Sequence, residues 1–561
     1  MKNTWQKALC VLLAFTMLFS FSAISFAEDT DTPDTEAEEL TEEVTEEIPG
    51  VPVPVIYVGG RQDYIYANGK DPEAGTYLTA SLPEGAMGEI IDAAGKELFN
   101  GILKNDWDSF CDILYNAISE YFAPVALDEK GNVTNTTGYD CLKKETLNDE
   151  AIEGLYGLHD YEFVYDWRLD PCANAVELAS FIKAVKAATA SEKVDIVASG
   201  MGYSTVLAYL AQCGYADLEA CMIYGAGLNG SDTVGALFSG DLMIDDDALN
   251  RYIQENLSDT DIVLGLSQYA ADLVISNGFA DSLFNLTTRI YKQIYTKVLP
   301  RILMDSFGTM PGYWSLVGDE YYETAKEISF SGKSAGEQEE APDYSVLIKK
   351  LDHFHYNILN NAKELLDGAI KDGVKLYNVV KYGKQIMPLS ANADKTSDGI
   401  NLLESSSLGA TAAKLGEKLT EEYIAGKAAA PDGKFLSPDG EVDASTGYLP
   451  MHTWYIKNLP QASEPEIVNI MLEKILAFDG YTTVFDLEEY SQFLVCSNDA
   501  DRMENLTETG VITPSVKDEL EELIGFDSPT GIIKKIFSIV AELVDMMRYF
   551  IDIFRSGELF A

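Results

Sequence analysis

Histidine and positive charge are both scarce in this sequence. Its 561 residues include four histidines, and its 40 lysines and arginines are outnumbered by 91 aspartates and glutamates, which gives a formal net charge of −51. A surface this acidic repels the phosphates of nucleic acids and of anionic membranes, so neither class of partner is expected. Solubility and self-repulsion explain the charge most simply, and binding of divalent cations to the surface is the alternative.

Cysteine is sparse too, with seven in the chain, and their spacing matches no zinc site. One of them, Cys10, lies within residues 1–27. The other six are Cys111, Cys141, Cys172, Cys213, Cys221 and Cys496. Outside the cell these six can form disulfides or stay as buried free thiols, and both alternatives remain open.

Residues 1–27 have the features of a secretory signal peptide. Lys2 and Lys7 supply positive charge before a mostly apolar stretch over 8–21, and small residues predict cleavage after Ala27. The apolar stretch is too short for a lasting membrane anchor. We therefore expect a secreted protein.

The remaining chain divides by composition into three parts. Residues 28–50 carry eleven acidic side chains and no basic one, which predicts an acidic disordered linker. The folded part is expected to begin at residue 51 and to form one domain over 51–465. A helical extension is expected over 466–561.

The segment Lys193–Tyr209 predicts a strand, a tight turn and a helix in immediate succession. Val194–Ala198 has strand character, and apolar residues recur with helical spacing after the turn. Small residues, Ala198 and Gly202, lie two positions before and two positions after Gly200. Such spacing is typical of a sharp turn at which a helix packs closely against the strand before it.

Other strand-like runs alternate with helical patterns on both sides of this segment. They lie at 51–58, Tyr161–Arg168, Ala220–Tyr224 and Leu376–Met387. This alternation indicates a parallel sheet with right-handed crossover connections. The expected fold class is therefore α/β, a mostly parallel sheet with helices on both faces.

Residues 231–375 interrupt the alternation with several amphipathic helical patterns. We expect a helical cap insertion over the carboxyl edge of the sheet, where ligands bind in such folds. Its aromatic residues either line an apolar pocket or pack the cap onto the sheet. They are Phe307, Tyr313, Trp314, Tyr321 and Tyr322.

Within the C-terminal extension, residues 531–555 predict a helix with a narrow polar face and a wide apolar face. The charges of Glu542, Asp545 and Arg548 argue against a transmembrane span. We expect this helix to dock on the body of the protein. Contact with a membrane surface or with a protein partner is the alternative.

Two segments together point to a family. Residues 165–170 read Tyr-Asp-Trp-Arg-Leu-Asp, and residues 193–202 end in Ser-Gly-Met-Gly. The pair resembles the lipase and lecithin:cholesterol acyltransferase-like branch of the α/β-hydrolases, in which such a strand end precedes the turn that carries the nucleophile. The resemblance is good over roughly 160–245 and weaker over 51–62 and 376–455. It implies an α/β-hydrolase fold, and its active members cleave or transfer acyl groups of lipid esters.

The resemblance also assigns site residues. It gives Gly200 at the position of the nucleophilic serine, Asp398 as the acid and His452 as the base, in the chain order of that fold. The backbone N–H donors of an oxyanion hole would lie at Met201, Gly59 and Gly60.

Gly200 has no side chain, so it cannot act as a nucleophile. We therefore predict a degenerate member that binds an apolar or lipid-like ligand, or a protein partner, without cleaving it. The alternative is an active lipid esterase or O-acyltransferase in which Ser199 or Ser204 serves as nucleophile with Asp398 and His452. A purely structural role for the hydrolase frame is a third possibility.

Neither a cofactor nor a metal ion is expected. His353 and His355 would share a metal only if their segment were extended, whereas its helical pattern directs them apart. Asp394–Gly399 is similar to the first half of a calcium loop, but the twelfth position is Ser405 rather than the glutamate that such loops use.

Overall fold

The computed structural model describes residues 53–59, 65–67, 76–77, 97, 101, 104–122, 126–134, 137–139, 157–241, 293, 297–330, 342–386, 391–461, 463–497 and 500–510. The chain divides into two compact units, and all of these residues belong to the first, Met1–Asp245 with Tyr291–Ile512. The expected signal peptide, the acidic linker, Gly60 and the amphipathic segment 531–555 lie outside the described residues.

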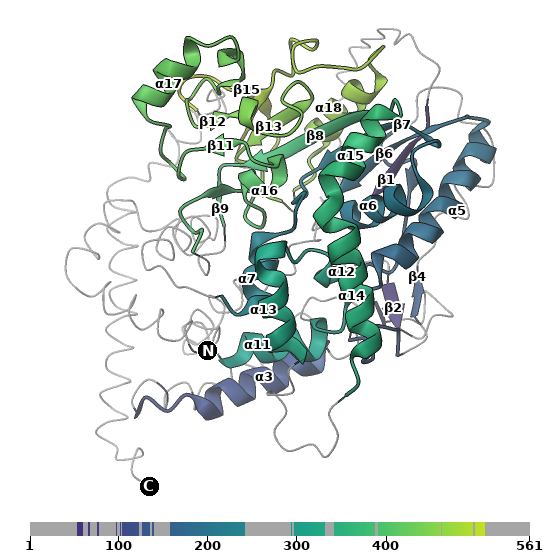
Figure 1. Cartoon of the computed structure of the whole chain (residues 1–561). Coiled ribbons are helices and arrows are strands. Elements are labelled where there is room, and N and C mark those ends of the chain that lie inside the picture. The colour runs from purple at the N-terminus through teal and green to yellow at the C-terminus, as the bar shows by residue number, and fades with distance from the viewer. Residues whose placement is uncertain are drawn as a thin grey trace, which may run out of the picture. The chain divides into compact units, whose positions relative to one another are not determined.

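An eight-stranded sheet forms the centre of this unit (Figure 1). Its strand order is β15-β14-β13-β8-β7-β6-β1-β5, and every neighbouring pair is parallel except β14 and β15. The strands are β1 (Val55–Val58), β5 (Tyr161–Glu162), β6 (Val194–Ser199), β7 (Leu218–Tyr224), β8 (Lys375–Tyr382), β13 (Thr453–Lys457), β14 (Phe493–Cys496) and β15 (Met503–Asn505). The expected α/β class is confirmed.

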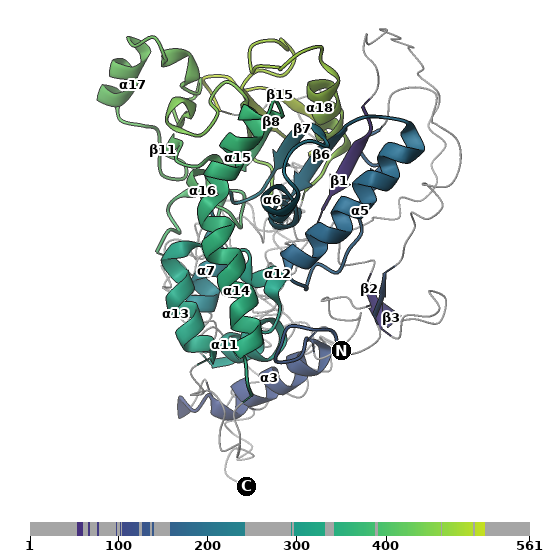
Figure 2. The same ribbon diagram turned by 45° about the vertical axis from the view of Figure 1, so that its right-hand side comes forward.

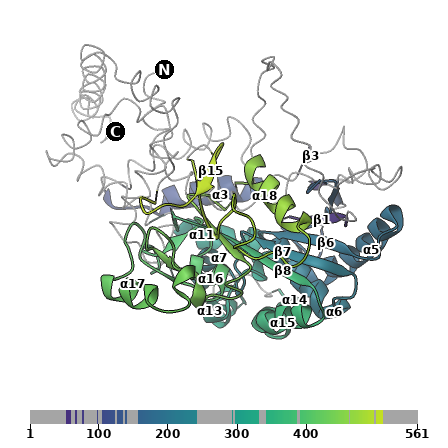
Figure 3. The same ribbon diagram turned by 90° about the horizontal axis from the view of Figure 1, so that it is seen from above.

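Helices cover both faces of the sheet (Figure 3). One face is covered by α5 (Pro171–Thr189), α6 (Gly202–Cys213) and α15 (Ala362–Lys371), and the other by α18 (Glu466–Ala477). Every residue of β1, β6 and β14 is buried. Strands covered on both faces are expected to read as continuous apolar runs, which is how these segments appear in the sequence.

The face beneath α18 holds a large apolar core. Four side chains of α18 join buried side chains from six strands of the sheet, β1, β6, β7, β8, β13 and β14, in one cluster. The helix contributes Val468, Met471, Leu472 and Ile475, and the strands contribute Met222, Val379, Trp454 and Ile456 among others. Burial of each such side chain stabilises the fold by about 1.5–3 kcal/mol before conformational entropy is counted.

The other described elements are three small sheets and further helices (Figure 2). Three small sheets join β2 (Ile65–Ala67) with β3 (Thr76–Tyr77) and β4 (Thr137–Tyr139), β9 (Lys384–Gln385) with β10 (Thr396–Ser397), and β11 (Thr411–Ala412) with β12 (Val442–Asp443). The helices are α3 (Asp108–Phe122), α7 (Asp232–Ser239), α11 (Leu299–Ile302), η4 (Leu303–Phe307), α12 (Pro311–Trp314), α13 (Asp319–Phe330), α14 (Ser345–Asn357), η5 (Leu359–Asn361), α16 (Leu403–Ser407), α17 (Glu421–Ala428), η6 (Gly433–Phe435) and η7 (Ala444–Thr446).

The aromatic residues of the insertion pack against one another. Trp314 meets Phe238 and Tyr322 edge to face, with ring centroids 5.1 Å and 6.0 Å apart. Tyr313 meets Trp167, in the segment before α5, at 5.5 Å. Aromatic pairs of this geometry contribute about 0.5–1.5 kcal/mol each beyond their burial. These side chains therefore pack against one another and against the segment before α5.

The C-terminal part of the chain differs from the helical extension expected from residue 466. Helix α18 is present, but Phe493–Cys496 and Met503–Asn505 are strands that continue the main sheet beyond β13. Phe493–Cys496 reads Phe-Leu-Val-Cys, and all four residues are buried. A short apolar run of this kind suits a buried strand, and the helical patterns around it hid this signal.

A buried carboxyl group on β6 makes the stability of the fold depend on pH. Asp195 is 4% exposed, and its Oδ1 has no hydrogen-bond partner among the described residues. Burial, with a contribution from Glu219, raises the pKa of Asp195 to about 7. The free energy of unfolding therefore benefits fully from the protonated Asp195 carboxyl below the unfolded pKa of about 3.9. This benefit is lost as the pH rises through about 7, where the buried group ionises in the folded state.

Asp195→Asn is expected to raise the free energy of unfolding by on the order of 3 kcal/mol at about pH 8, because the amide carries no charge to desolvate. At about pH 4 the variant and the wild type should differ little. Urea unfolding followed by circular dichroism at both pH values measures the difference. An equal change at both values would show that the charge of Asp195 is not its cause.

Candidate functional site

The strand, turn and helix expected at Lys193–Tyr209 are present as β6, Gly200 and α6. Gly200 has a φ of +50°, a backbone conformation that residues with side chains rarely adopt. A Cβ added at Gly202 would lie 1.9 Å from the backbone oxygen of Val58 on β1. The two glycines therefore permit the sharp turn and the close approach of α6 to the sheet.

The side chain of Gln461 lies opposite Gly200. A Cβ added at Gly200 would be 2.8 Å from Gln461 Nε2. Gln461 is 7% exposed, and its Oε1 has no hydrogen-bond partner among the described residues. Its backbone N–H donates to the backbone oxygen of Asp398 at 2.9 Å. Gln461 thus contacts both the turn at Gly200 and the loop that contains the expected acid.

Asp398 directly follows β10, in the connection between the main-sheet strands β8 and β13, where the resemblance places the acid. Its carboxylate accepts hydrogen bonds from the backbone N–H groups of Ile400 at 2.9 Å and Asn401 at 2.7 Å, and from Asn401 Nδ2 at 3.2 Å. Burial raises the pKa of Asp398 to about 6, and these hydrogen bonds act in the opposite direction. The carboxylate therefore holds its own loop together beside Gln461.

The structure does not bring His452 to this site. His452 precedes β13, and its backbone oxygen accepts from the backbone N–H of Asn378 in the middle of β8. His452 comes directly before Thr453, which is aligned through the parallel strands with Asn378 on β8 and Ala198 on β6, so His452 lies at the amino end of β13, with β8 and β7 between that strand and β6, which Gly200 follows. Its ring stacks on Tyr481 at 3.7 Å, and its Nδ1 lies 2.7 Å from the backbone oxygen of Thr482. The expected base therefore lies apart from Gly200 and Asp398 in the structure, because chain order alone does not show on which side of a strand a residue falls.

Gln461 is the residue that the sequence reasoning missed. It comes four positions after the end of β13. The run Thr453–Ile456 could have indicated a buried strand in the sequence. His452 comes before that strand and Gln461 after it. A search restricted to histidines passes over this position.

Lys381, near the end of β8, fixes the segment that carries Gln461. Its Nζ donates to the backbone oxygens of Gln461 at 2.7 Å and Ser463 at 2.8 Å, and lies 4.0 Å from the centroid of the Tyr224 ring. Burial lowers the pKa of Lys381 to about 8. The ammonium group is one donor to both carbonyls, and the backbone oxygen of Ser463 also accepts from the Tyr224 hydroxyl at 3.2 Å.

The two alternative nucleophiles point elsewhere. Ser199 is 6% exposed, and its Oγ donates to Glu464 Oε1 at 2.7 Å. The hydroxyl of Tyr57 donates to the same oxygen. Ser204 is 4% exposed within α6. Neither serine forms a hydrogen bond with a histidine among the described residues.

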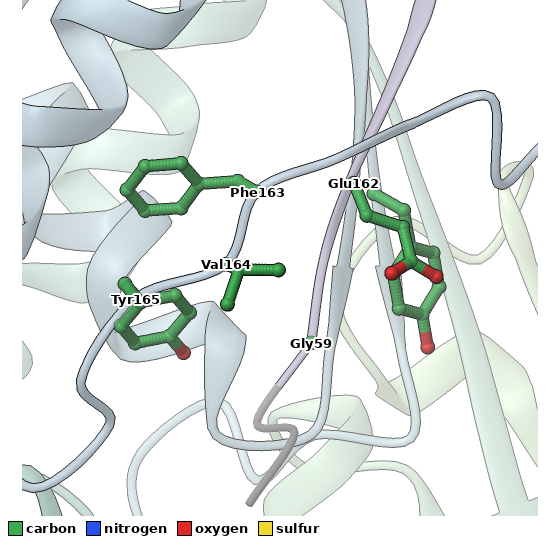
Figure 4. Close-up of a pocket in the computed structure, with 6 residues that line it drawn as sticks. Gly59, Glu162, Phe163, Val164 and Tyr165 are labelled. Atoms are coloured by element: carbon green, nitrogen blue, oxygen red, sulfur yellow. The ribbon is translucent and has the colours of Figure 1, made fainter. Parts of the chain in front are cut away.

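The expected oxyanion donors are placed in part. Met201 precedes α6, and the N–H groups of Met201 and Gly202 donate to no backbone oxygen of the described residues. Gly59 follows β1, and its nitrogen would lie 3.2 Å from a Cβ on Gly202, so it adjoins the start of α6. A small pocket opens beside Gly59 between the ends of β1 and β5 (Figure 4). Its lining residues are Tyr57, Gly59, Glu162, Phe163, Val164 and Tyr165.

The residues considered for metal binding have other partners. His355 is buried and lies 3.0 Å from Asp319, whereas His353, on the same helix, contacts Asn357 at 3.1 Å. Asp394 pairs with Lys414 at 2.6 Å. Across the described ranges, no three His, Cys, Asp or Glu side chains gather in a way that could hold a metal ion.

Comparisons of this chain with protein families, with curated proteins and with solved structures found no match. A search of the described helices finds none with the length and apolar character needed to cross a membrane. The cysteines among the described residues are free thiols: Cys111, Cys172, Cys213, Cys221 and Cys496. Function is therefore inferred from the geometry around Gly200.

Proposed function

We propose that this chain is a secreted, lipase- and acyltransferase-like protein of the α/β-hydrolase fold that has lost its catalytic residues. It binds an apolar or lipid-like ligand, or a protein partner, at the carboxyl edge of its sheet. The observation that carries this proposal is Gly200. A turn with the φ and the close helix approach of a nucleophile elbow presents no side chain there.

The order of the strands supports the hydrolase frame. In that fold the nucleophile, the acid and the base follow successive elements of one parallel sheet. Here Gly200 follows β6, Asp398 follows β8 and Gln461 follows β13. The backbone contact between Gln461 and Asp398, and the 2.8 Å approach of Gln461 Nε2 to Gly200, bring the three positions together.

At these three positions the chain lacks two of the groups that an α/β-hydrolase needs, the nucleophile and the base. Glycine supplies no oxygen to attack an ester, and the amide of glutamine has no titratable group that accepts and returns a proton near neutral pH. Without nucleophile and base, only residual catalysis from bound geometry is expected.

An active esterase or O-acyltransferase remains a second candidate because of one contact. The Ser199 hydroxyl donates a hydrogen bond to the carboxylate of Glu464, so a hydroxyl group and a carboxylate that can accept from it lie side by side. A serine and a carboxylate without an intervening base form a weak nucleophilic pair. Wild-type turnover of p-nitrophenyl esters that Ser199→Ala removes would establish this candidate and overturn the proposal.

Restoring both lost groups is expected to restore reactivity. The wild type and Gly200→Ser alone should neither hydrolyse p-nitrophenyl butyrate nor react with a fluorophosphonate probe, because serine lacks a base. Gly200→Ser combined with Gln461→His should react with the probe, and the further change Asp398→Asn should reduce the reaction rate by about 100-fold or more.

Fluorophosphonate labelling followed by mass spectrometry measures each variant and identifies the labelled residue. The matched control combines Gly200→Ser with Gln492→His, which places the histidine at another buried glutamine. If the folded Gly200→Ser, Gln461→His protein stays unlabelled, Gln461 does not occupy the position of the base.

A further inference from the structure

The connection between β13 and α18 crosses the sheet at the carboxyl ends of four strands. Each of these strands supplies one side chain to it, from its last residue or from the residue before that. The side chains are Lys381, Tyr224, Ser199 and Tyr57, from β8, β7, β6 and β1 in the order of the sheet. The parallel register directs all four to one face of the sheet, where the connection runs.

The first contacts along the connection hold backbone oxygen atoms. Lys381 Nζ donates to the backbone oxygens of Gln461 at 2.7 Å and Ser463 at 2.8 Å. The hydroxyl of Tyr224 also donates to the backbone oxygen of Ser463, at 3.2 Å. These hydrogen bonds attach the connection to β8 and β7.

The last contact is made by a carboxylate. Glu464 Oε1 accepts hydrogen bonds from Ser199 Oγ at 2.7 Å and from the hydroxyl of Tyr57. Both donor residues are buried, and a hydrogen bond to a charged group is stronger than one between neutral groups. Glu464 therefore fastens the connection to β6 and β1, the two strands of the four that lie furthest from β13.

Side chains rather than backbone groups provide most of this attachment. For Gln461, Ser463 and Glu464, as far as the structure describes the connection, a single backbone–backbone hydrogen bond leads to another part of the chain. It runs from the N–H of Gln461 to the oxygen of Asp398, at 2.9 Å. The strands beneath are joined by continuous backbone pairing, so the connection should open at a lower free energy than the sheet.

We propose that Glu464 is a latch that keeps the connection closed over the carboxyl ends of β8, β7, β6 and β1, and that its release from Ser199 and Tyr57 admits the ligand. This inference rests on the proposed function, because that proposal places the ligand at the carboxyl edge of the sheet. Gln461, on the same connection, lies opposite Gly200, so the closed connection also covers the turn. Such a latch lowers the apparent affinity for a ligand in proportion to the fraction of molecules that are open.

Hydrogen exchange of the full chain, followed by mass spectrometry, measures how readily the connection opens. Glu464→Ala removes the latch, and Tyr57→Phe combined with Ser199→Ala removes its two donors while the carboxylate stays. In both variants we expect the peptide that spans positions 461 to 464 to exchange at least about tenfold faster than in the wild type. The exchange of β6 should not change.

Glu473→Ala is the matched control. Glu473 lies on α18 and is partly buried like Glu464, but it accepts from the backbone N–H of Leu158, at 2.7 Å. Its removal should leave the exchange of the connection as it is in the wild type. Thermal unfolding of each variant confirms that it is folded.

Titration with Nile red, an uncharged apolar dye that fluoresces more strongly when bound, measures access to the carboxyl edge. We expect Glu464→Ala to bind the dye with a Kd at least about tenfold lower than that of the wild type, and Glu473→Ala to bind it with an unaltered Kd.

Unchanged exchange of the connection in the folded latch variants, or exchange that rises equally in β6, would overturn the latch. Faster exchange with unaltered or absent dye binding would overturn its control of ligand entry and leave the non-catalytic proposal standing. Hydrolysis of p-nitrophenyl butyrate by the wild type or by Glu464→Ala would instead overturn the proposed function.

Discussion

Gly202→Ala is expected to lower the free energy of unfolding by at least about 3 kcal/mol. The new methyl group would lie 1.9 Å from the backbone oxygen of Val58, and a backbone atom of a strand paired with β6 cannot move aside as a flexible side chain can. The gain in helix propensity from glycine to alanine, about 1 kcal/mol, is too small to compensate. Urea unfolding followed by circular dichroism measures the change.

Gly426→Ala is the matched control for this prediction. Gly426 lies inside α17, and a Cβ added there meets no atom within 4 Å. The same substitution should therefore be neutral or stabilise the protein by up to about 1 kcal/mol. If Gly202→Ala proves as harmless as Gly426→Ala, α6 does not approach β1 as closely as the structure shows.

Asp166→Asn is expected to cost about 3–5 kcal/mol of folding stability. Asp166 and Arg168 form a doubly hydrogen-bonded ion pair, with Nε to Oδ1 at 2.9 Å and Nη2 to Oδ2 at 2.6 Å, and the two side chains are 0% and 1% exposed. Asparagine keeps the shape of aspartate but leaves the guanidinium buried without its counter-charge. The free energy of unfolding in urea again gives the size of the effect.

Glu489→Gln provides the comparison for this ion pair. Glu489 pairs with Lys474 at 2.9 Å, with side chains 54% and 42% exposed, so its loss should cost no more than about 1 kcal/mol. The double variant Asp166→Asn, Arg168→Met should recover part of the loss, because it removes both buried charges. An Asp166→Asn protein as stable as Glu489→Gln would contradict the buried-pair argument.

The elbow was predictable from the sequence because its signals are local. The strand Val194–Ser199, the glycine at position 200 and the helix from Gly202 occupy one continuous segment, and each follows from residue type and spacing. The α/β class was predictable for the same reason. Strands of a parallel sheet are buried on both faces and read as apolar runs separated by helical patterns.

The partners of the elbow were not predictable in the same way. Gln461 reaches Gly200 only because the sheet places β13 in the order β13-β8-β7-β6. The local spacing of residues does not predict which distant segments pair in a sheet. His452 was favoured because its chemistry fits a base, yet it lies on the wrong side of its strand. Asp398 was proposed as the acid because a turn-forming Asp-Gly after a strand is itself a local signal.

The edges of the eight-stranded sheet have a consequence for how the molecule behaves in a crowded solution. At one edge lies β5, with two residues, and at the other lies β15, with three residues including Glu504. Exposed strand edges are templates on which a second molecule can add its own strand, and short or charged edges offer few groups for such growth. The short run Met503–Asn505, antiparallel to β14, also shields the apolar strand Phe493–Cys496 from this role. We therefore expect the folded form to resist edge-to-edge aggregation.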